Sequence, residues 1–309
     1  MKIHRDIENL PAFQNAVITI GTFDGVHMGH RQIINKLKDE ASAINGETVI
    51  ITFHPHPRKV IASTILGVRL INTLEERLQL LEQLGVDHVV VVPFTDAFAN
   101  QPAEDYIKNF LIEKFHPHTI IIGYDHRFGK ERKGDYLLLE KKAAEYGYEL
   151  KEIPKHVLDE ISISSTKIRE ALLEGKLEVA DKLLGYEFFF SGVVVHGDKL
   201  GRKLGYPTAN LKILDEEKIT PGNGIYAVYA QPEGFGRRLK GMMSIGFRPT
   251  VDGKKRVIEV NIFDFDKEIY GETLKVYVKK YLREELKFSG LDELIEQMGQ
   301  DKIESLKVL

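Results

Sequence analysis

The chain has 309 residues, of which 43% are hydrophobic and 29% are charged, and its formal net charge is −3. The absence of cysteine excludes disulfides, zinc–thiolate centres, thiol nucleophiles and iron–sulfur clusters. The acidic balance argues against bulk binding of nucleic acid, and no apolar run is long enough to span a membrane. Because the charged N-terminus also lacks the apolar core of a secretory signal, we expect a cytoplasmic protein.

The first half of the chain alternates short β-branched runs with helical patterns. Strands are predicted at 16–20, 48–53, 88–92 and 119–122. Four helices are predicted. The first runs from His30 to about residue 44, the second starts near Thr73, and the last two cover 103–115 and 135–146. This alternation predicts a parallel sheet of βαβ units, which binds ligands at the carboxyl ends of its strands.

The pattern changes near residue 185, where Gly185 can end a helical run over 172–184. Strands are then predicted at 187–195, 224–230, 238–246, 255–263 and 273–281, with a helix over the last twenty residues. Short strands separated by turn residues at this spacing favour a small antiparallel barrel. We therefore expect two domains, residues 1–185 and 186–309.

The most informative stretch of the first half is IGTFDGVHMGHRQII, residues 20–34. It joins a strand to a helix through a turn that contains His27, Gly29 and His30. The backbone amides and dipole of a helix N-terminus favour a phosphate there, and two imidazoles can donate further hydrogen bonds. The alternative is an ordinary connection with polar surface histidines, and the preceding FDG makes it the weaker interpretation.

Two further loops combine cations with polar groups. Residues 123–129 read GYDHRFG and are followed by more cations, which suits a flat, phosphorylated ligand. Residues 164–169 read SSTKIR, where hydroxyls at a helix start precede Lys167 and Arg169 and indicate an anion site. Taken alone, these loops could be a solvated charged loop and a capped helix. Together they favour in-line displacement at phosphorus, which needs positioning and positive charge.

The predicted barrel has its own glycine-rich segment, HGDKLGRKLGYPTAN at 196–210, which is not a Walker loop. Its glycines and cations can wrap a phosphate chain. Thr208 and Asn210 share one face of an extended segment and offer hard oxygen ligands for Mg²⁺. Glu259 lies in an alternating strand and has two interpretations. It could be a general base inside the barrel, or it could face outward into solvent. Spacing alone favours the outward position.

The quoted motifs, with TFHPHP at 52–57, closely resemble the adenylyltransferase module of bacterial riboflavin kinase/FAD synthetases, in the HxGH nucleotidyltransferase superfamily. Residues 196–298 resemble the flavokinase barrel over nearly its whole length. The resemblance implies a Rossmann-like α/β domain followed by a six-stranded Greek-key β-barrel with a terminal helix. It also implies that riboflavin is phosphorylated by MgATP to FMN, and that AMP is then transferred from ATP to FMN, giving FAD and pyrophosphate.

The resemblance assigns roles to particular residues. The catalytic set would be His27, His30, Arg169 and, as the base for the riboflavin hydroxyl, Glu259. Residues that bind ATP would be Thr22, Phe23, Asp24, Gly25, Gly29, Ser164, Ser165, Thr166, Gly197, Gly201, Lys203 and Gly205. Those near the flavin would be Asp125, His126, Phe128, Arg283 and Phe288, and the metal ligands would be Thr208 and Asn210.

The chain departs from the family pattern at His126, where phenylalanine is more common, and at Asn261, where histidine is common. Three rival functions have less support: a related transferase for nicotinamide mononucleotide or phosphopantetheine, a nucleic-acid enzyme, and a flavin-binding regulator with inactive sites. We expect small-molecule substrates, no nucleic acid and no membrane partner, and leave weak self-association open.

Overall fold

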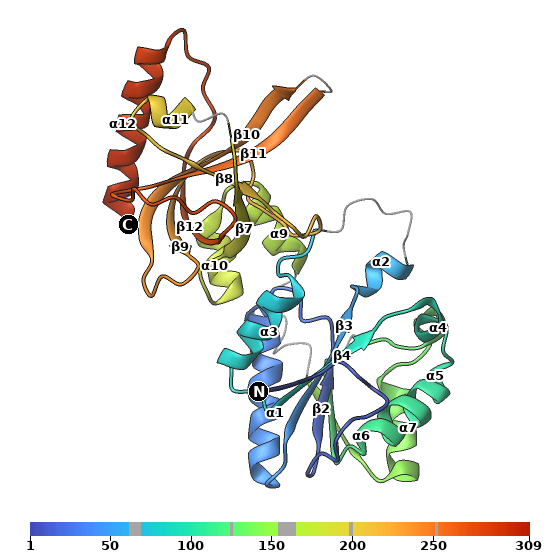
Figure 1. The fold of residues 1–309 in the computed structure, drawn as a ribbon. Coiled ribbons are helices and arrows are strands. Elements are labelled where there is room, and N and C mark those ends of the chain that lie inside the picture. Colours follow the sequence, from blue (N-terminus) through green and yellow to red (C-terminus); the bar gives the residue numbers. More distant parts are fainter. Residues whose placement is uncertain (62–68, 124–125, 154–164, 198–199, 251–252) are drawn as a thin grey trace. The chain divides into compact units, whose positions relative to one another are not determined.

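The computed structural model describes residues 1–61, 69–123, 126–153, 165–197, 200–250 and 253–309. They form two compact units, Met1–Ser164 and Ser165–Leu309, which are described separately (Figure 1). No helix in these described ranges is long and apolar enough to cross a bilayer.

The first unit is built on a six-stranded parallel sheet with the order β1-β4-β3-β2-β5-β6. Its strands are β1 (Lys2–His4), β2 (Val17–Ile20), β3 (Thr48–His54), β4 (His88–Pro93), β5 (Thr119–Gly123) and β6 (Glu149–Ile153). Every residue of β2 is buried, because helices cover both faces of the sheet, and this explains the apolar run without polar alternation. The four predicted strands and their parallel arrangement are confirmed.

Helices α1 (Met28–Ala43) and α3 (Leu74–Gln83) lie on one side of this sheet (Figure 1). The other side carries α5 (Ala103–Asp105), the π-helix η1 (Tyr106–Ile112), α6 (Glu113–Phe115) and α7 (Tyr136–Tyr146). Short turns form α2 (Pro57–Ile61), α4 (Asp96–Ala99) and η2 (Lys130–Arg132). The predicted capping box of Thr73 and Glu76 is present, and Gly147 ends α7 in the left-handed conformation as predicted.

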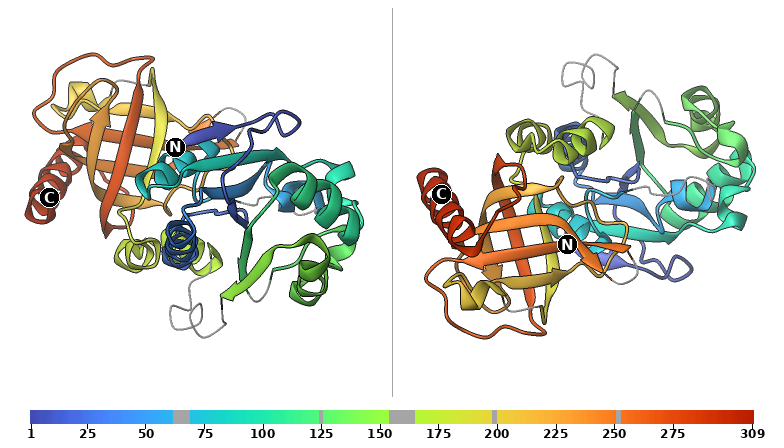
Figure 2. Two further views of the ribbon diagram at one scale, coloured as in Figure 1. Left: turned by 90° about the horizontal axis from the view of Figure 1, so that it is seen from below. Right: turned by 90° about the horizontal axis from the view of Figure 1, so that it is seen from above.

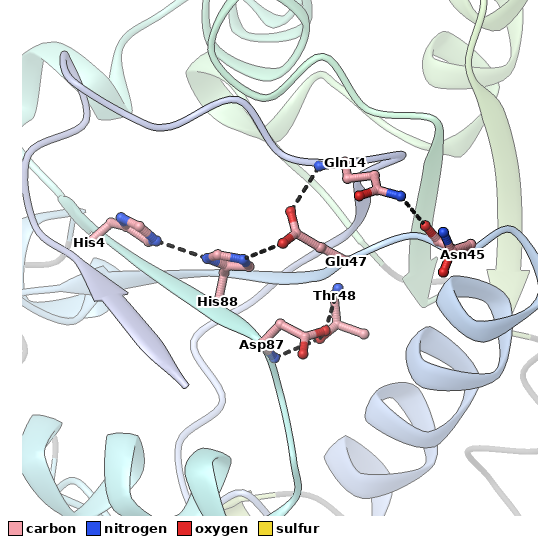
Figure 3. Close-up of polar contacts among 7 residues, drawn as sticks. All are labelled: His4, Gln14, Asn45, Glu47, Thr48, Asp87 and His88. Atoms are coloured by element: carbon pink, nitrogen blue, oxygen red, sulfur yellow. Dashed lines mark hydrogen bonds and ion pairs between the residues drawn. The ribbon is translucent and has the colours of Figure 1, made fainter.

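Strands β1 and β6 at the two edges were not predicted, because both are short and partly polar. Side chains at the β1 edge reinforce its few backbone hydrogen bonds (Figure 3). The rings of His4 and His88 are hydrogen-bonded at 3.0 Å, and His88 Nε2 lies 3.3 Å from a carboxylate oxygen of Glu47. The other oxygen of Glu47 accepts from the amide of Gln14 at 2.8 Å, and this bond lowers the pKa of the carboxyl group.

The strand order places a topological switch point beside β2. The chain runs from β2 through β3 to β4 on one side and then returns to β5 on the other side of β2. The loops that follow β2 and β5 are therefore neighbours at the carboxyl edge, where ligands bind in sheets of this type. This edge brings together the predicted phosphate turn and the start of the GYDHRFG segment.

The second unit contains a closed antiparallel barrel with the order β10-β11-β8-β7-β12-β9 (Figures 1 and 2). Its strands are β7 (Phe189–Val195), β8 (Ala209–Lys212), β9 (Gly224–Pro232), β10 (Leu239–Thr250), β11 (Gly253–Ile262) and β12 (Thr273–Arg283). Helix α12 (Leu291–Val308) packs against β9, β10 and β12, and α11 (Leu200–Lys203) is a single turn. The expected six-stranded barrel with a terminal helix is confirmed, although β8 was not predicted as a strand.

Helices α9 (Ser165–Leu173) and α10 (Leu177–Leu184) belong to this unit. The continuous helical run predicted over 172–184 is wrong, because Gly175 at φ 71° separates the two helices. The carbonyl of Leu172 accepts from Gly222, and the carboxylate of Asp181 accepts from the amide of Phe188 at 2.8 Å. The compact unit thus starts before residue 185, and a domain boundary at 185/186 stays a prediction.

Candidate functional site

The turn after β2 has an uncommon backbone conformation. Phe23, Gly25 and Val26 all have positive φ, at 49°, 90° and 38°. Only glycine adopts this region freely, and a β-branched residue such as Val26 is strained there. Such strain persists where surrounding contacts enforce it, and it is often found at ligand sites. Here it turns the chain sharply so that α1 begins at Met28 rather than after His30.

The two histidines of this turn are held against each other. His27 is the N-cap of α1, and its Nδ1 accepts from the amide of His30 at 3.3 Å. The two rings stack with centroids 3.7 Å apart, and the ring of Phe23 lies 5.0 Å from that of His30. Both imidazoles are therefore fixed at a helix N-terminus, the position predicted for a phosphate.

His30 is arranged to stay neutral and to meet a ligand. Burial lowers its pKa well below the usual value, and the nearby His27 and Arg77 act in the same direction. Its Nδ1 is buried and has no hydrogen-bond partner among the described residues. A buried polar atom without a partner is costly, so a bound phosphate group that interacts with this nitrogen would remove the deficit.

Asp24 and Thr22 tie the turn to neighbouring segments through hydrogen bonds. Asp24 is 1% exposed, and its Oδ1 accepts from the amides of Ile71 and Asn72 at 2.9 and 3.2 Å. The carbonyl of Thr22 accepts from the guanidinium of Arg77 at 2.8 Å. These contacts are structural, and the binding of ATP by Thr22 and Asp24 stays a prediction. The sequence analysis missed Arg77, although a cation between Leu74 and Leu78 on the apolar face of a helix was a readable signal.

The segment after β5 packs aromatic rings against the core of the first unit. Phe128 is buried and stacks on Tyr106 of the π-helix at 4.9 Å, and the ring of His126 lies 5.8 Å from Phe128. Gly129 lies so close to Ala103 that a side chain would clash with it. The sequence analysis missed Tyr106, which only this contact brings to the loop. Asp125, predicted near the flavin, lies outside the described residues.

The SSTKIR motif falls largely on α9. Ser164 lies outside the described residues, and Ser165 and Thr166 begin the helix. Ile168 is fully buried, whereas Thr166 is exposed and Arg169 is partly exposed. The motif thus lies at a helix N-terminus as predicted. Its convergence with the histidine turn stays a prediction.

A cavity of about 310 Å³ opens between the barrel and α12. It gathers five of the site residues that the sequence analysis selected: Gly201, Thr208, Glu259, Arg283 and Phe288. Apolar side chains from β10 and α12 complete much of the wall: Met242, Met243, Leu294 and Met298. An apolar hollow with a few polar groups suits a flat, weakly polar ligand with a hydroxylated tail.

Glu259 faces this cavity, so the outward position that spacing alone favoured is wrong. One carboxylate oxygen accepts from the hydroxyl of Thr208 at 3.4 Å, and the other forms an ion pair with Arg248. Asn210 lies opposite Glu259 across β8 and β11. A carboxylate, a hydroxyl and an amide are therefore grouped on one side of the barrel.

Arg283 has a partner that the sequence analysis did not include. Its Nε and one terminal nitrogen donate to the two oxygens of Asp301 on α12 at 2.7 and 2.6 Å. Asp301 is 5% exposed and also accepts from Gln297 at 3.1 Å. This bidentate pair fixes the helical wall of the cavity. The flavin contact of Arg283 stays a prediction.

The predicted metal ligands suit Mg²⁺ by their chemistry. Thr208, Asn210 and Glu259 offer hard oxygen atoms. Among the residues that the structure describes, no group of three or more histidine or acidic side chains could hold a metal alone. Phosphate oxygens and water would have to complete the coordination. Asn261, the departure from the family pattern, donates to the carbonyl of Pro207 at 2.6 Å and so supports the segment that carries Thr208.

Thr208 also borders a second, smaller hollow of about 60 Å³. Its lining includes Arg202, Lys267 and Tyr270. Gly205 has φ 83° just after α11, and Gly197 lies against the side chain of Asn210 with no room for a Cβ. Lys203 ends α11. Glu268 also lines this hollow and lies 3.3 Å from Arg202, so the two cations are partly balanced by a carboxylate. The cations, the aromatic ring and the neighbouring glycine-rich segment are groups that can contact a nucleotide.

Comparisons with known proteins agree with this arrangement. A family model described as FAD synthetase matches residues 10–167, and one described as Riboflavin kinase matches residues 184–309. The bifunctional riboflavin kinase/FMN adenylyltransferase of Escherichia coli (strain K12) is 38% identical over 98% of this chain and 96% of its own length. The protein of that name from Bacillus subtilis (strain 168) is 37% identical over 94% of this chain and 92% of its own.

A solved structure titled as a macrolide-efflux protein from Streptococcus pneumoniae has a TM-score of 0.86 and 31% identity, covering 98% of both chains. That title describes the other protein. Both units of this chain match family models and carry the corresponding motifs in order. The chain belongs to the family of bifunctional riboflavin kinase/FMN adenylyltransferases.

Proposed function

We propose that this chain makes FAD from riboflavin in two steps. The barrel phosphorylates riboflavin with MgATP to give FMN, and the predicted N-terminal domain of residues 1–185 transfers AMP from a second ATP to FMN, releasing pyrophosphate. The observation that carries the proposal is the grouping around Thr208. Thr208 lines both the apolar cavity that contains Glu259 and the smaller hollow that contains Arg202, Lys267 and Glu268.

In the kinase step, riboflavin would occupy the larger cavity, with its ring system against the methionines and Phe288. Glu259 would accept the proton of the ribityl hydroxyl as the hydroxyl oxygen attacks the γ-phosphorus of ATP. The bond from the γ-phosphorus to the bridging oxygen then breaks, and ADP leaves. Arg202 and Lys267 would bind the nucleotide in the smaller hollow. Thr208 and Asn210 would contribute ligands to Mg²⁺, which supplies positive charge to the phosphate oxygens.

In the adenylyl step, the phosphate of FMN attacks the α-phosphorus of ATP. His27 and His30 would donate hydrogen bonds to phosphate oxygens. The lowered pKa of His30 keeps it neutral, and a neutral imidazole still has one N–H to donate. The flavin would lie beside the segment of residues 126–129, which the stacking of Phe128 on the buried Tyr106 holds against the core. Ser164, Ser165, Thr166 and Arg169 would hold the triphosphate and the departing pyrophosphate.

The test is to incubate the purified protein with riboflavin, ATP and Mg²⁺ and to separate FMN and FAD by chromatography. A second reaction starts from FMN, and a third contains a chelator. No FMN from riboflavin would exclude the kinase step. FMN that accumulates without FAD would exclude the adenylyl step. Undiminished turnover with the chelator would exclude Mg²⁺. Cytoplasmic location and weak self-association also stay predictions.

A further inference from the structure

Helix α3 buries an arginine on its apolar face. Arg77 is 1% exposed and is among the largest fully buried side chains in the described part of the chain. Burial lowers the pKa of its guanidinium, whereas Asp24 and Glu75 raise it through space. The group nevertheless stays charged, because arginine is protonated at every pH at which proteins work. A charge in such a place is costly unless contacts compensate for it.

The contacts of Arg77 join the ends of two central strands. One terminal nitrogen donates to the carbonyl of Thr22 and to the hydroxyl of Thr52, both at 2.8 Å, and to the carbonyl of Phe53 at 3.3 Å. Thr52 in turn donates to the carbonyl of Thr22 at 3.2 Å. Thr22 starts the strained turn, and the other two residues lie near the end of β3. The guanidinium therefore fixes the base of the turn that carries the two histidines.

The positive charge of Arg77 also affects the protonation of His30. It lies close enough to act with burial and His27 in lowering the pKa of His30. Among the described residues, no ion pair joins Arg77 to a carboxylate, although Asp24 and Glu75 lie near enough to raise the pKa of its guanidinium and to offset part of its charge. Its Nε is buried without a partner in the same part of the chain. A buried cation beneath a helix N-terminus adds to the positive potential felt by a phosphate chain.

We propose that Arg77 is a positioning residue for adenylyl transfer, which holds the turn of residues 22–27 so that His27 and His30 meet the phosphates of ATP. The inference rests on the proposed function. It goes further by assigning a role to a residue outside the sequence motifs. Because Arg77 acts through the turn, its loss should lower the turnover number of FAD formation more than it weakens substrate binding.

The experiment compares Arg77→Met, Arg77→Lys and Thr52→Val with the unmodified chain. For each variant, kcat and KM are measured for FMN to FAD, and FMN formation from riboflavin serves as an internal control in the same molecule. Arg77→Met should reduce kcat for FAD formation by about 10- to 100-fold. Arg77→Lys should recover part of it, because lysine keeps the charge without the planar fork. Thr52→Val removes one contact of the guanidinium and should cost about fivefold.

The pH profile gives a reading that a simple loss of folded protein would not produce. His30 is faced by His27 from its own turn and by Arg77 from α3, and Arg77 itself feels the carboxylates of Asp24 and Glu75. Removing the charge of Arg77 raises the pKa of His30, so the acid side of the profile for FAD formation should move to higher pH. In Arg77→Lys, which keeps the charge, the acid side should stay near that of the unmodified chain.

Lys38→Met is the matched control, because Lys38 also donates to a backbone carbonyl, that of Leu84, but does not contact the turn. It should leave FAD formation unchanged. The proposal is overturned if Arg77→Met and Thr52→Val keep the kcat and pH profile of the unmodified chain. It is also overturned if activity falls only in proportion to the folded fraction. An unmodified chain that makes no FAD from FMN would instead refute the proposed function.

Discussion

Replacing Glu259 with glutamine tests the assignment of the catalytic base in the barrel. The amide keeps the size of the side chain and an oxygen that can accept from Thr208, but it cannot take the proton of the riboflavin hydroxyl. General base catalysis contributes about 10²- to 10⁴-fold, so FMN formation should fall by that factor. The change corresponds to about 2.7 to 5.5 kcal/mol in the activation free energy.

Glu259→Gln should lower the free energy of unfolding by much less than it raises the activation free energy of FMN formation. The substitution breaks the ion pair with Arg248, whose side chain is 37% exposed, while that of Glu259 is 19% exposed. Partly exposed pairs contribute about 1 kcal/mol or less, because solvent screens them. The melting temperature should therefore fall by only a few degrees, about 2–4 °C for a chain of this size. Catalysis and stability are thus affected on clearly different scales.

The assay follows FMN from riboflavin and, separately, FAD from supplied FMN, with the melting temperature measured in parallel. Glu259→Gln should lose the first activity and keep the second. Glu187→Gln is the matched control, since Glu187 is also paired with an arginine, Arg238, but does not line the cavity. If Glu259→Gln kept FMN formation within tenfold of the unmodified chain (about 1.4 kcal/mol), Glu259 would not be the base. Loss of both activities in a folded protein would refute two independent sites.

Three further predictions concern other parts of the chain. His30→Ala should abolish FAD formation from FMN and leave FMN formation intact in the chromatographic assay; retained FAD formation would contradict the role of the turn. Asp301→Asn breaks the buried pair with Arg283, so it should lower the free energy of unfolding by about 2–4 kcal/mol and raise the KM for riboflavin; an unchanged KM would show that the helical wall does not shape the cavity. Burial raises the pKa of Asp181 to about 6 from 3.8, so folding favours its protonated form and this contribution to stability is lost as the pH rises through about 6. Asp181→Asn should therefore have a higher free energy of unfolding than the unmodified chain at pH 7.5, by about 1–2 kcal/mol after allowance for solvent screening, and the difference should vanish near pH 4; a gain that did not depend on pH would contradict this origin.

Features that depend on residues close together in the chain could be predicted without the structure. The alternation of strands and helices, the capping box of Thr73 and Glu76, and the stop at Gly147 were all predicted correctly. The resemblance of the motifs to one enzyme family was equally local, because each motif lies within a short stretch. It led to the same two-step function that the comparisons support.

The limits of the sequence appear where side chains or strands from distant positions meet. Arg77 and Thr22 are 55 positions apart, and Arg283 and Asp301 join a strand to a helix beyond a loop. Strands β1, β6 and β8 are short, and pairing with distant partners stabilises them rather than their own periodicity. Local propensity contains no information about such partners.

Glu259 is the clearest case in which the structure differs from what its sequence spacing favoured. Its strand alternates, and spacing alone favoured an exposed position. The closed barrel decided the matter, because register with β8 and β10 turns its carboxylate toward the cavity, Thr208 and Arg248. The sequence thus determined which chemical groups this protein contains and which local elements carry them. Only the tertiary structure decided which of those groups face one another, since that depends on strand pairing and packing between distant segments.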